Sequence, residues 1–82
     1  MPYRRLLCIM SDEKEMLNKV GKNISRIRRK RAISQSELAT IANIEKSTLG
    51  HIEIGTRNPT IRTLFKIAKA LNVTLSELVR YK

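Results

Sequence analysis

The chain has 82 residues, which is enough for one domain with its own core but too few for two. Its 17 Lys and Arg outnumber its 7 Asp and Glu, giving a formal net charge of +10. Three aromatic residues and no Trp argue against binding single-stranded nucleic acid by base stacking. The positive charge indicates an anionic partner, and its ordinary alternative is a solvated basic helix face.

The sequence offers neither a metal-ligand set nor a paired nucleophile and base. Cys8 is the single cysteine and His51 the single histidine, so we expect no intrachain disulfide and no Cys/His zinc site. We therefore expect no cofactor and no enzymatic activity. The apolar run at residues 6–10 is too short for a signal peptide or a membrane span, so we expect a cytoplasmic protein without membrane contact.

Residues 1–10, MPYRRLLCIM, differ from the rest of the chain because they follow no helical period. Three interpretations stay open: a disordered basic arm, a short strand, or residues upstream of a later start at Met10 or Met16. The expected organisation is an N-terminal arm or extension at 1–10, followed by one domain at 11–82.

The first predicted helix covers about residues 12–31, with Ser11 as its N-cap. Gly21 weakens its middle by about 1 kcal/mol, so a start nearer Asn18 is the alternative. Its apolar residues recur at three- and four-residue spacing: Leu17, Val20, Ile24 and Ile27. Its second half is strongly cationic, with Lys19, Lys22, Arg26, Arg28, Arg29, Lys30 and Arg31.

Two short helices joined by a tight turn are predicted between Ser34 and Gly55. Ser34 and Glu37 have the spacing of a capping box, which begins a helix at residues 35–42. Asn43 is the natural stop, because Asn tolerates left-handed backbone. A second helix follows at residues 46–54 and ends at Gly55.

The second helix of this pair carries more polar surface than a core requires. The pair's expected core residues are Leu38, Ala39, Ala42, Leu49 and Ile52. On the opposite face of the second helix stand Lys46, Ser47, Gly50 and His51. A polar helix face on a strongly basic domain is typical of proteins that read DNA through the major groove.

Two more helices are predicted after the loop at residues 57–59. Thr60 caps a helix at 61–71, whose apolar stripe comprises Ile61, Leu64, Ile67, Ala68 and Leu71. Thr74 and Glu77 form a second capping box before a last helix at about 75–81. With no strand pattern after residue 10, the expected fold is all-α, a compact bundle of five helices.

Together these motifs resemble the lambda-repressor-like (Cro/C1-type, XRE) helix-turn-helix domain. The resemblance covers residues 20–78, and its pieces are IxxxR at 24–28, SQxELA at 34–39, STLxxIExG at 47–55, NPT at 58–60 and LFKIAKALNVTLSEL at 64–78. It implies that the second helix lies across the DNA backbone and that the third is the recognition helix.

The resemblance also implies roles for single residues. It places Lys46, Ser47, Thr48 and His51 at base edges, and Gln35, Arg57 and Asn58 at phosphates. It pairs Arg28 with Glu53 in a partly buried ion pair between the first and third helices. The bland alternatives are that His51 is an ordinary surface residue, that Thr48 only packs against the second helix, and that both ion-pair residues are surface charges.

The sequence departs from the family pattern at four positions. Glu45 stands where a small polar N-cap is usual, and a carboxylate there either repels phosphate or selects a cytosine amino group. Ala32 and Asn43 occupy turn positions where Gly is common. Gly50 leaves the recognition face one side chain short.

One recognition helix reads too few base pairs to be specific in a genome, so a homodimer on a palindromic operator is expected. We favour helix 75–81, with Val79 and Tyr81, as the dimer surface; residues 1–10 are the second candidate. The predicted function is a sequence-specific regulator of transcription that binds double-stranded DNA, in the form of a repressor. The alternative is an antitoxin or adaptor that mainly binds a partner protein, with an exposed apolar patch for it.

Overall fold

The computed structural model describes the backbone of residues 2–80 and the side chains of residues 12–80. This part of the chain contains five helices and no strand. They are α1 (Pro2–Lys30), α2 (Gln35–Ala42), α3 (Lys46–Glu53), α4 (Ile61–Leu71) and α5 (Leu75–Val79). The all-α prediction is confirmed, and the molecule measures 46 × 23 × 19 Å along its principal axes.

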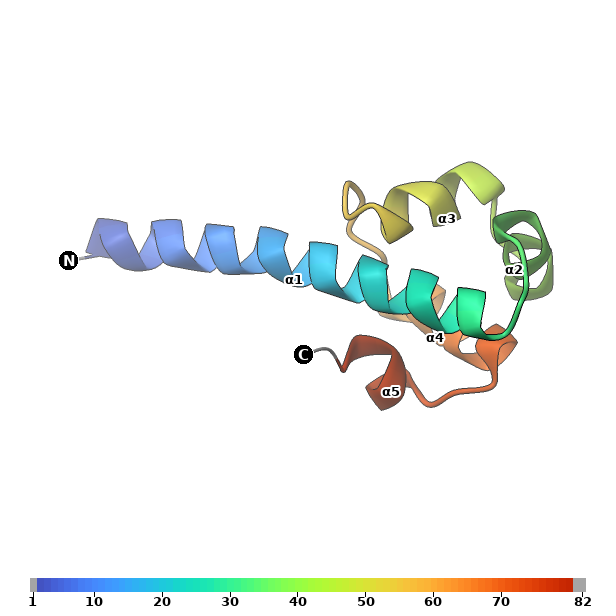
Figure 1. The fold of residues 1–82 in the computed structure, drawn as a ribbon. Helices are drawn as coiled ribbons and strands as arrows, with labels where there is room; N and C mark the ends of the chain where they lie inside the picture. Colours follow the sequence, from blue (N-terminus) through green and yellow to red (C-terminus); the bar gives the residue numbers. More distant parts are fainter. Residues whose placement is uncertain (1, 81–82) are drawn as a thin grey trace.

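Helix α1 is much longer than predicted. It begins at Pro2, so the N-cap predicted at Ser11 is wrong and helical backbone runs through that residue. A proline is tolerated in the first turn, and the Leu, Arg and Met that follow have high helix propensity. The N-terminal half of α1 projects beyond the other four helices (Figure 1). Whether residues 1–10 form a separate unit stays a prediction.

The other helix boundaries agree closely with the sequence. Both capping boxes are formed, Ser34 with Glu37 and Thr74 with Glu77, and Thr60 caps α4 as predicted. Asn43 ends α2 in the left-handed conformation, with φ 57°. Helix α5 ends at Val79, and the Tyr81 of the predicted dimer surface lies outside the described residues.

The core gathers one face of every helix. Its buried hydrophobic residues are Val20, Ile24, Leu38, Ala39, Ala42, Leu49, Ile52, Leu64, Ile67, Ala68, Leu71 and Leu78. Ile61 was predicted to join them, but that prediction is wrong, since it is 70% exposed. It occupies the first position of α4, one turn before Leu64, where that helix first reaches the core.

Gly21 has a packing role that outweighs its poor helix propensity. A Cβ at this position would overlap the carbonyl oxygen of Ile52 and lie 2.6 Å from that of Glu53, at the end of α3. Glycine therefore lets α1 and α3 come closer than any side chain allows. Gly50, in the middle of α3, has no neighbour within 4 Å of the corresponding point.

Gly21→Ala and Gly50→Ala should change stability in opposite directions. Gly21→Ala should lower the free energy of unfolding by about 1–3 kcal/mol, because overpacking outweighs the gain in helix propensity. Gly50→Ala should raise it by about 0.5–1 kcal/mol, because only the propensity changes. Urea unfolding of both variants measures this; equal stabilisation by the two substitutions would contradict the close contact.

Candidate nucleic-acid interface

The turn between α2 and α3 is built by local backbone bonds. The left-handed Asn43 turns the chain, and the amide of Ile44 donates to the carbonyl of Ala39 (2.9 Å). Ile44 then packs against the core that contains Leu49, the fourth residue of α3. This is the hydrophobic staple expected at the start of that helix. These contacts fix the angle at which α3 leaves the turn.

Helix α3 has one buried face and one polar face. Leu49 and Ile52 are buried, whereas Lys46, Ser47 and His51 are exposed. Thr48 is half-buried, so only part of its side chain reaches solvent. Glu45 is the N-cap, and its side chain makes no capping hydrogen bond. The amides of the first turn of α3 therefore lack the partner that a Ser or Asp would supply.

Sequence reasoning missed Thr56, which orients the His51 ring. Its hydroxyl donates to the backbone carbonyl of His51 (3.2 Å) and lies 3.2 Å from Nδ1 of the same residue. Because the hydroxyl has one proton and a carbonyl can only accept, we assign Nδ1 as the donor of the second bond. A neutral His51 then presents Nε2 as an acceptor, which suits an adenine or cytosine amino group.

An ion pair between α1 and α3 stands behind the polar face. Arg28 Nε donates to Glu53 Oε2 (2.8 Å) and Nη2 donates to Oε1 (3.2 Å). The two residues are 9% and 7% exposed. Arg28 also donates from Nη1 to the carbonyl of Ile33 (2.9 Å), in the loop before α2. Two parallel bonds make this the strong, bidentate form of an Arg–carboxylate pair.

Gln35 joins the same network. Its Nε2 donates to Glu53 Oε1 (3.0 Å), so its side chain contacts the ion pair, and it is half-buried at the first position of α2. Its backbone amide lies in the first turn of α2, where Ser34 Oγ already accepts from the amide of Glu37, and the positive end of this helix is suited to an anion. Arg57 and Asn58 are exposed in the loop between α3 and α4. No buried side-chain nitrogen or oxygen in the described residues lacks a hydrogen-bond partner.

Comparison with known proteins agrees with this geometry. The family model described as "Helix-turn-helix" (HTH_3) matches residues 24–78, from the last quarter of α1 to the buried Leu78 in α5. The chain belongs to the Cro/C1-type helix-turn-helix family. The first 22 residues of α1 (2–23) lie outside the match.

Three relatives give the extent of the likeness. A transcriptional regulator of this helix-turn-helix type from Sinorhizobium fredii, y4dJ, is 38% identical over 79% of this chain and 84% of its own. The controller protein C.AhdI of Aeromonas hydrophila is 32% identical, with a TM-score of 0.75 over 76% of this chain and 94% of its own. The controller protein C.Esp1396I, as a tetramer in complex with its natural 35-base-pair operator, is 30% identical, with a TM-score of 0.69 over 79% and 96%.

Within the described residues of this helix-turn-helix protein, no three His, Cys, Asp or Glu side chains gather into a group that would hold a metal ion. None of its described helices is long and apolar enough to cross a membrane.

The Arg28–Glu53 pair should be essential for stability. Glu53→Ala should lower the free energy of unfolding by about 3–5 kcal/mol, because Arg28 is left buried and unpaired. Arg28→Met/Glu53→Met should be less destabilised than that single variant, because no charge remains buried. The matched control is Glu45→Ala, an exposed carboxylate without a cap bond, which should change stability by less than about 0.5 kcal/mol. Thermal and urea unfolding measure all three; a loss below about 1 kcal/mol for Glu53→Ala would contradict the role.

Proposed function

We propose that this protein is a sequence-specific regulator of transcription that binds double-stranded DNA with α3 in the major groove. The observation that carries the proposal is the exposed polar face of α3, held from behind by the buried Arg28–Glu53 pair. The operator-bound relative and the net charge of +10 support it. We propose no catalytic step and no cofactor for this protein. We also propose that it is cytoplasmic, in keeping with its DNA-binding role.

We propose base contacts for four residues of α3. Lys46 donates to guanine O6 or N7, and Ser47 donates or accepts and so discriminates weakly. His51 accepts through Nε2 when neutral. Thr48 contacts bases with the part of its side chain that is exposed.

The proposed phosphate contacts flank these residues. The positive end of α2 binds a phosphate at the backbone amide of Gln35, whose side chain is held in position by Glu53. Arg57 and Asn58 bind the backbone from the loop that follows α3. These contacts fix the orientation of α3 and carry no sequence information themselves.

We further propose a homodimer through α5, which spaces two α3 helices about 34 Å apart on a palindromic operator. Val79 of α5 is 37% exposed, and Phe65 and Ile61, one turn apart on α4, add apolar surface that a partner subunit would cover. Such a dimer acts as a repressor where its operator overlaps a promoter, since bound protein then excludes RNA polymerase.

Selection of bound duplexes from a random pool tests sequence-specific binding of DNA. At near-physiological salt the protein should enrich a two-fold-symmetric site, and Lys46→Ala should weaken binding by about 1–3 kcal/mol per subunit and relax preference at one position. Arg57→Ala should weaken selected and random duplexes equally and lower the salt slope by about one per subunit.

Lys69→Ala, on α4, removes the same charge away from α3 and is the control. It should keep the selected preference and lose little affinity. Salt-sensitive binding without enrichment of any site would refute sequence-specific reading.

The dimer is tested separately by mass measurement in the same buffer. Val79→Asp should convert the dimer to a monomer, because it buries a charge in an apolar interface. Ile41→Asp is the matched control, since Ile41 is an exposed apolar residue on α2. It should remain dimeric; a monomeric wild-type protein, or two dimeric variants, would contradict an α5 interface.

A further inference from the structure

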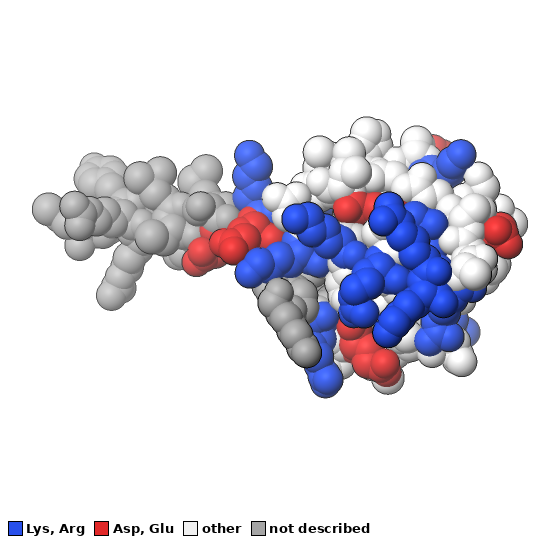
Figure 2. All heavy atoms as spheres, viewed as in Figure 1, with Lys and Arg blue, Asp and Glu red and all other residues white. Residues whose placement is uncertain are grey.

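A second cationic surface lies between α1 and α5. It is an open hollow of about 880 Å³, here called the α1–α5 groove, and Asn23 and Glu77 are among the residues that line it. Six of its lining residues are cations: Lys19, Lys22, Arg26, Lys30, Arg31 and Arg80. Glu77 is the one acid among the described residues of the lining. Figure 2 shows Lys and Arg side chains massed over this part of α1.

Hydrogen bonds join the two helices that form the groove. Asn23, which is 5% exposed, donates from Nδ2 to the carbonyls of Glu77 (3.1 Å) and Leu78 (2.7 Å), and so attaches α5 to α1. Arg26 Nη2 donates to Asn23 Oδ1, which holds that guanidinium over the groove. The two walls are therefore fixed relative to one another before any ligand arrives.

The charge of the groove is not neutralised from within. Glu77 Oε1 accepts from the backbone and the hydroxyl of Thr74, so the carboxylate is held at the helix cap. Lys19 pairs with Glu15 (3.2 Å). Neither Arg31 nor Arg80 has a side-chain hydrogen bond or ion pair with the described residues, and both are exposed.

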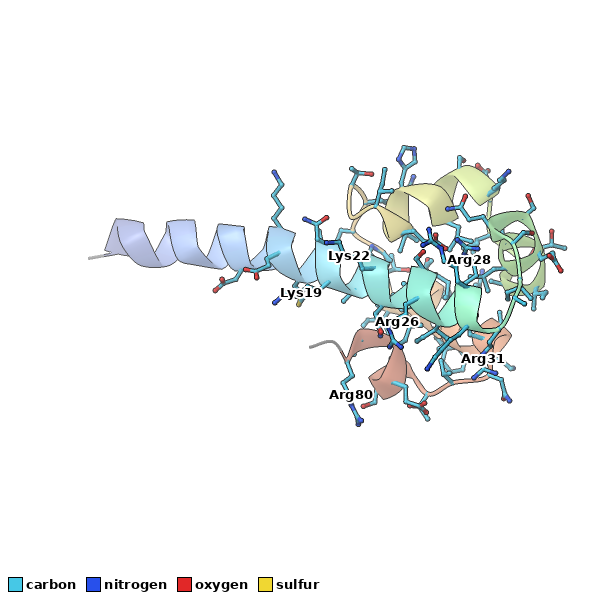
Figure 3. All side chains as sticks on the ribbon, viewed as in Figure 1. Lys19, Lys22, Arg26, Arg28, Arg31 and Arg80 are labelled. Atoms are coloured by element: carbon cyan, nitrogen blue, oxygen red, sulfur yellow. The ribbon has the colours of Figure 1, made fainter. Side chains whose placement is uncertain are left out.

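The part of the groove that contains Arg31 and Arg80 lies away from α3. Helices α3 and α5 lie on opposite sides of α1 (Figure 1). Arg28 points to the α3 side, whereas Arg26, Arg31 and Arg80 lie on the α5 side (Figure 3). Arg31 and Arg80 therefore lie on the side of α1 away from α3. Lys22, Arg26 and Lys30 are shared between the two sides of α1, because they also line a second hollow with Gln35 and Glu53.

The groove favours a phosphodiester backbone over other anions. Lys22, Arg26 and Lys30 repeat every four residues, which spaces cations about 6 Å apart along α1 and suits a linear polyanion with regular charges. Among the described residues the lining contains no aromatic side chain, and its apolar residues are Ile27 and Val73. A protein interface needs buried apolar anchors, which these two do not supply, whereas a phosphate backbone needs only cations.

A second copy of the chain is disfavoured as the ligand of this groove, because it would bring two such cationic linings together. The dimer proposed above uses Val79, which is not a lining residue of the groove. We propose that the α1–α5 groove binds the sugar–phosphate backbone of a second DNA duplex, independently of its sequence, on the side of the domain opposite α3. One protein then holds two duplex segments, and the salt dependence of the second contact comes from this groove.

A bridging assay tests the proposal. A duplex is immobilised on beads and saturated with protein; after washing, a labelled duplex of unrelated sequence is added at low salt. Wild-type protein should retain the labelled duplex, and retention should fall steeply as salt rises. Arg31→Glu/Arg80→Glu should retain at least about five-fold less, while the amount of protein on the beads stays equal.

The control variant is Lys66→Glu/Lys69→Glu, which makes the same change in net charge on α4, outside the groove. It should bridge like the wild-type protein, and thermal unfolding checks that both variants are folded. A charge effect that is merely global would reduce bridging equally in the two variants and overturn the proposal.

The remaining outcomes separate this proposal from sequence-specific binding of DNA. Undiminished bridging by Arg31→Glu/Arg80→Glu would mean that two α3 helices hold the two duplexes, which overturns the groove site. Capture of labelled poly-glutamate in place of the duplex would mean an acidic protein ligand and also overturn it. If selection finds no operator but bridging still depends on Arg31 and Arg80, the groove stands and the sequence-specific function fails.

Discussion

The arrangement of the helix-turn-helix depends on one buried ion pair. Arg28 reaches from α1 to Glu53 at the end of α3, and the same network takes in Gln35 of α2 and the carbonyl of Ile33 before it. Two buried charges are stable only while they stay paired. The ion pair therefore fixes the positions of α1, α2 and α3 relative to one another. Gly21 adds a steric condition: because it has no Cβ, the backbone of α1 can lie against the backbone of α3 at Ile52 and Glu53.

This constraint explains how a helix of eight residues can carry an exposed polar face. Such a short helix is marginal by itself in water, and its order comes from packing. Leu49 and Ile52 supply that packing, and the ion pair holds the C-terminal end. The outward residues of α3 are therefore not needed for packing in the core. Thr56 extends the same logic to His51, whose ring it orients from the following loop.

Helix α1 lies between two surfaces of different character. Toward α3 its side chains enter a dense, satisfied network around Arg28, where charge is matched and buried. Toward α5 the contact is made by a neutral amide, Asn23, and the surrounding cations stay at the surface. A net charge of +10 on 82 residues has to be distributed over the whole surface, and the bundle places much of it along this one helix.

The sequence by itself determined most helix boundaries and the core, because these are written in short-range signals. The capping boxes at Ser34 and Thr74 and the left-handed stop at Asn43 act within four residues, and apolar spacing selects the buried face of each helix. The resemblance to a known family, rather than spacing, indicated the partnership of Arg28 with Glu53, since 25 residues separate them.

Only the tertiary structure decided features that depend on how helices meet. Gly21 looks like a defect in an isolated helix, and its use appears only where α3 comes against it. Ile61 matches the stripe of α4 but lies before the point at which that helix reaches the core. The attachment of Asn23 to α5 joins residues more than 50 positions apart. Periodicity reports which face of a helix is apolar, but distance and partner are properties of the assembled fold.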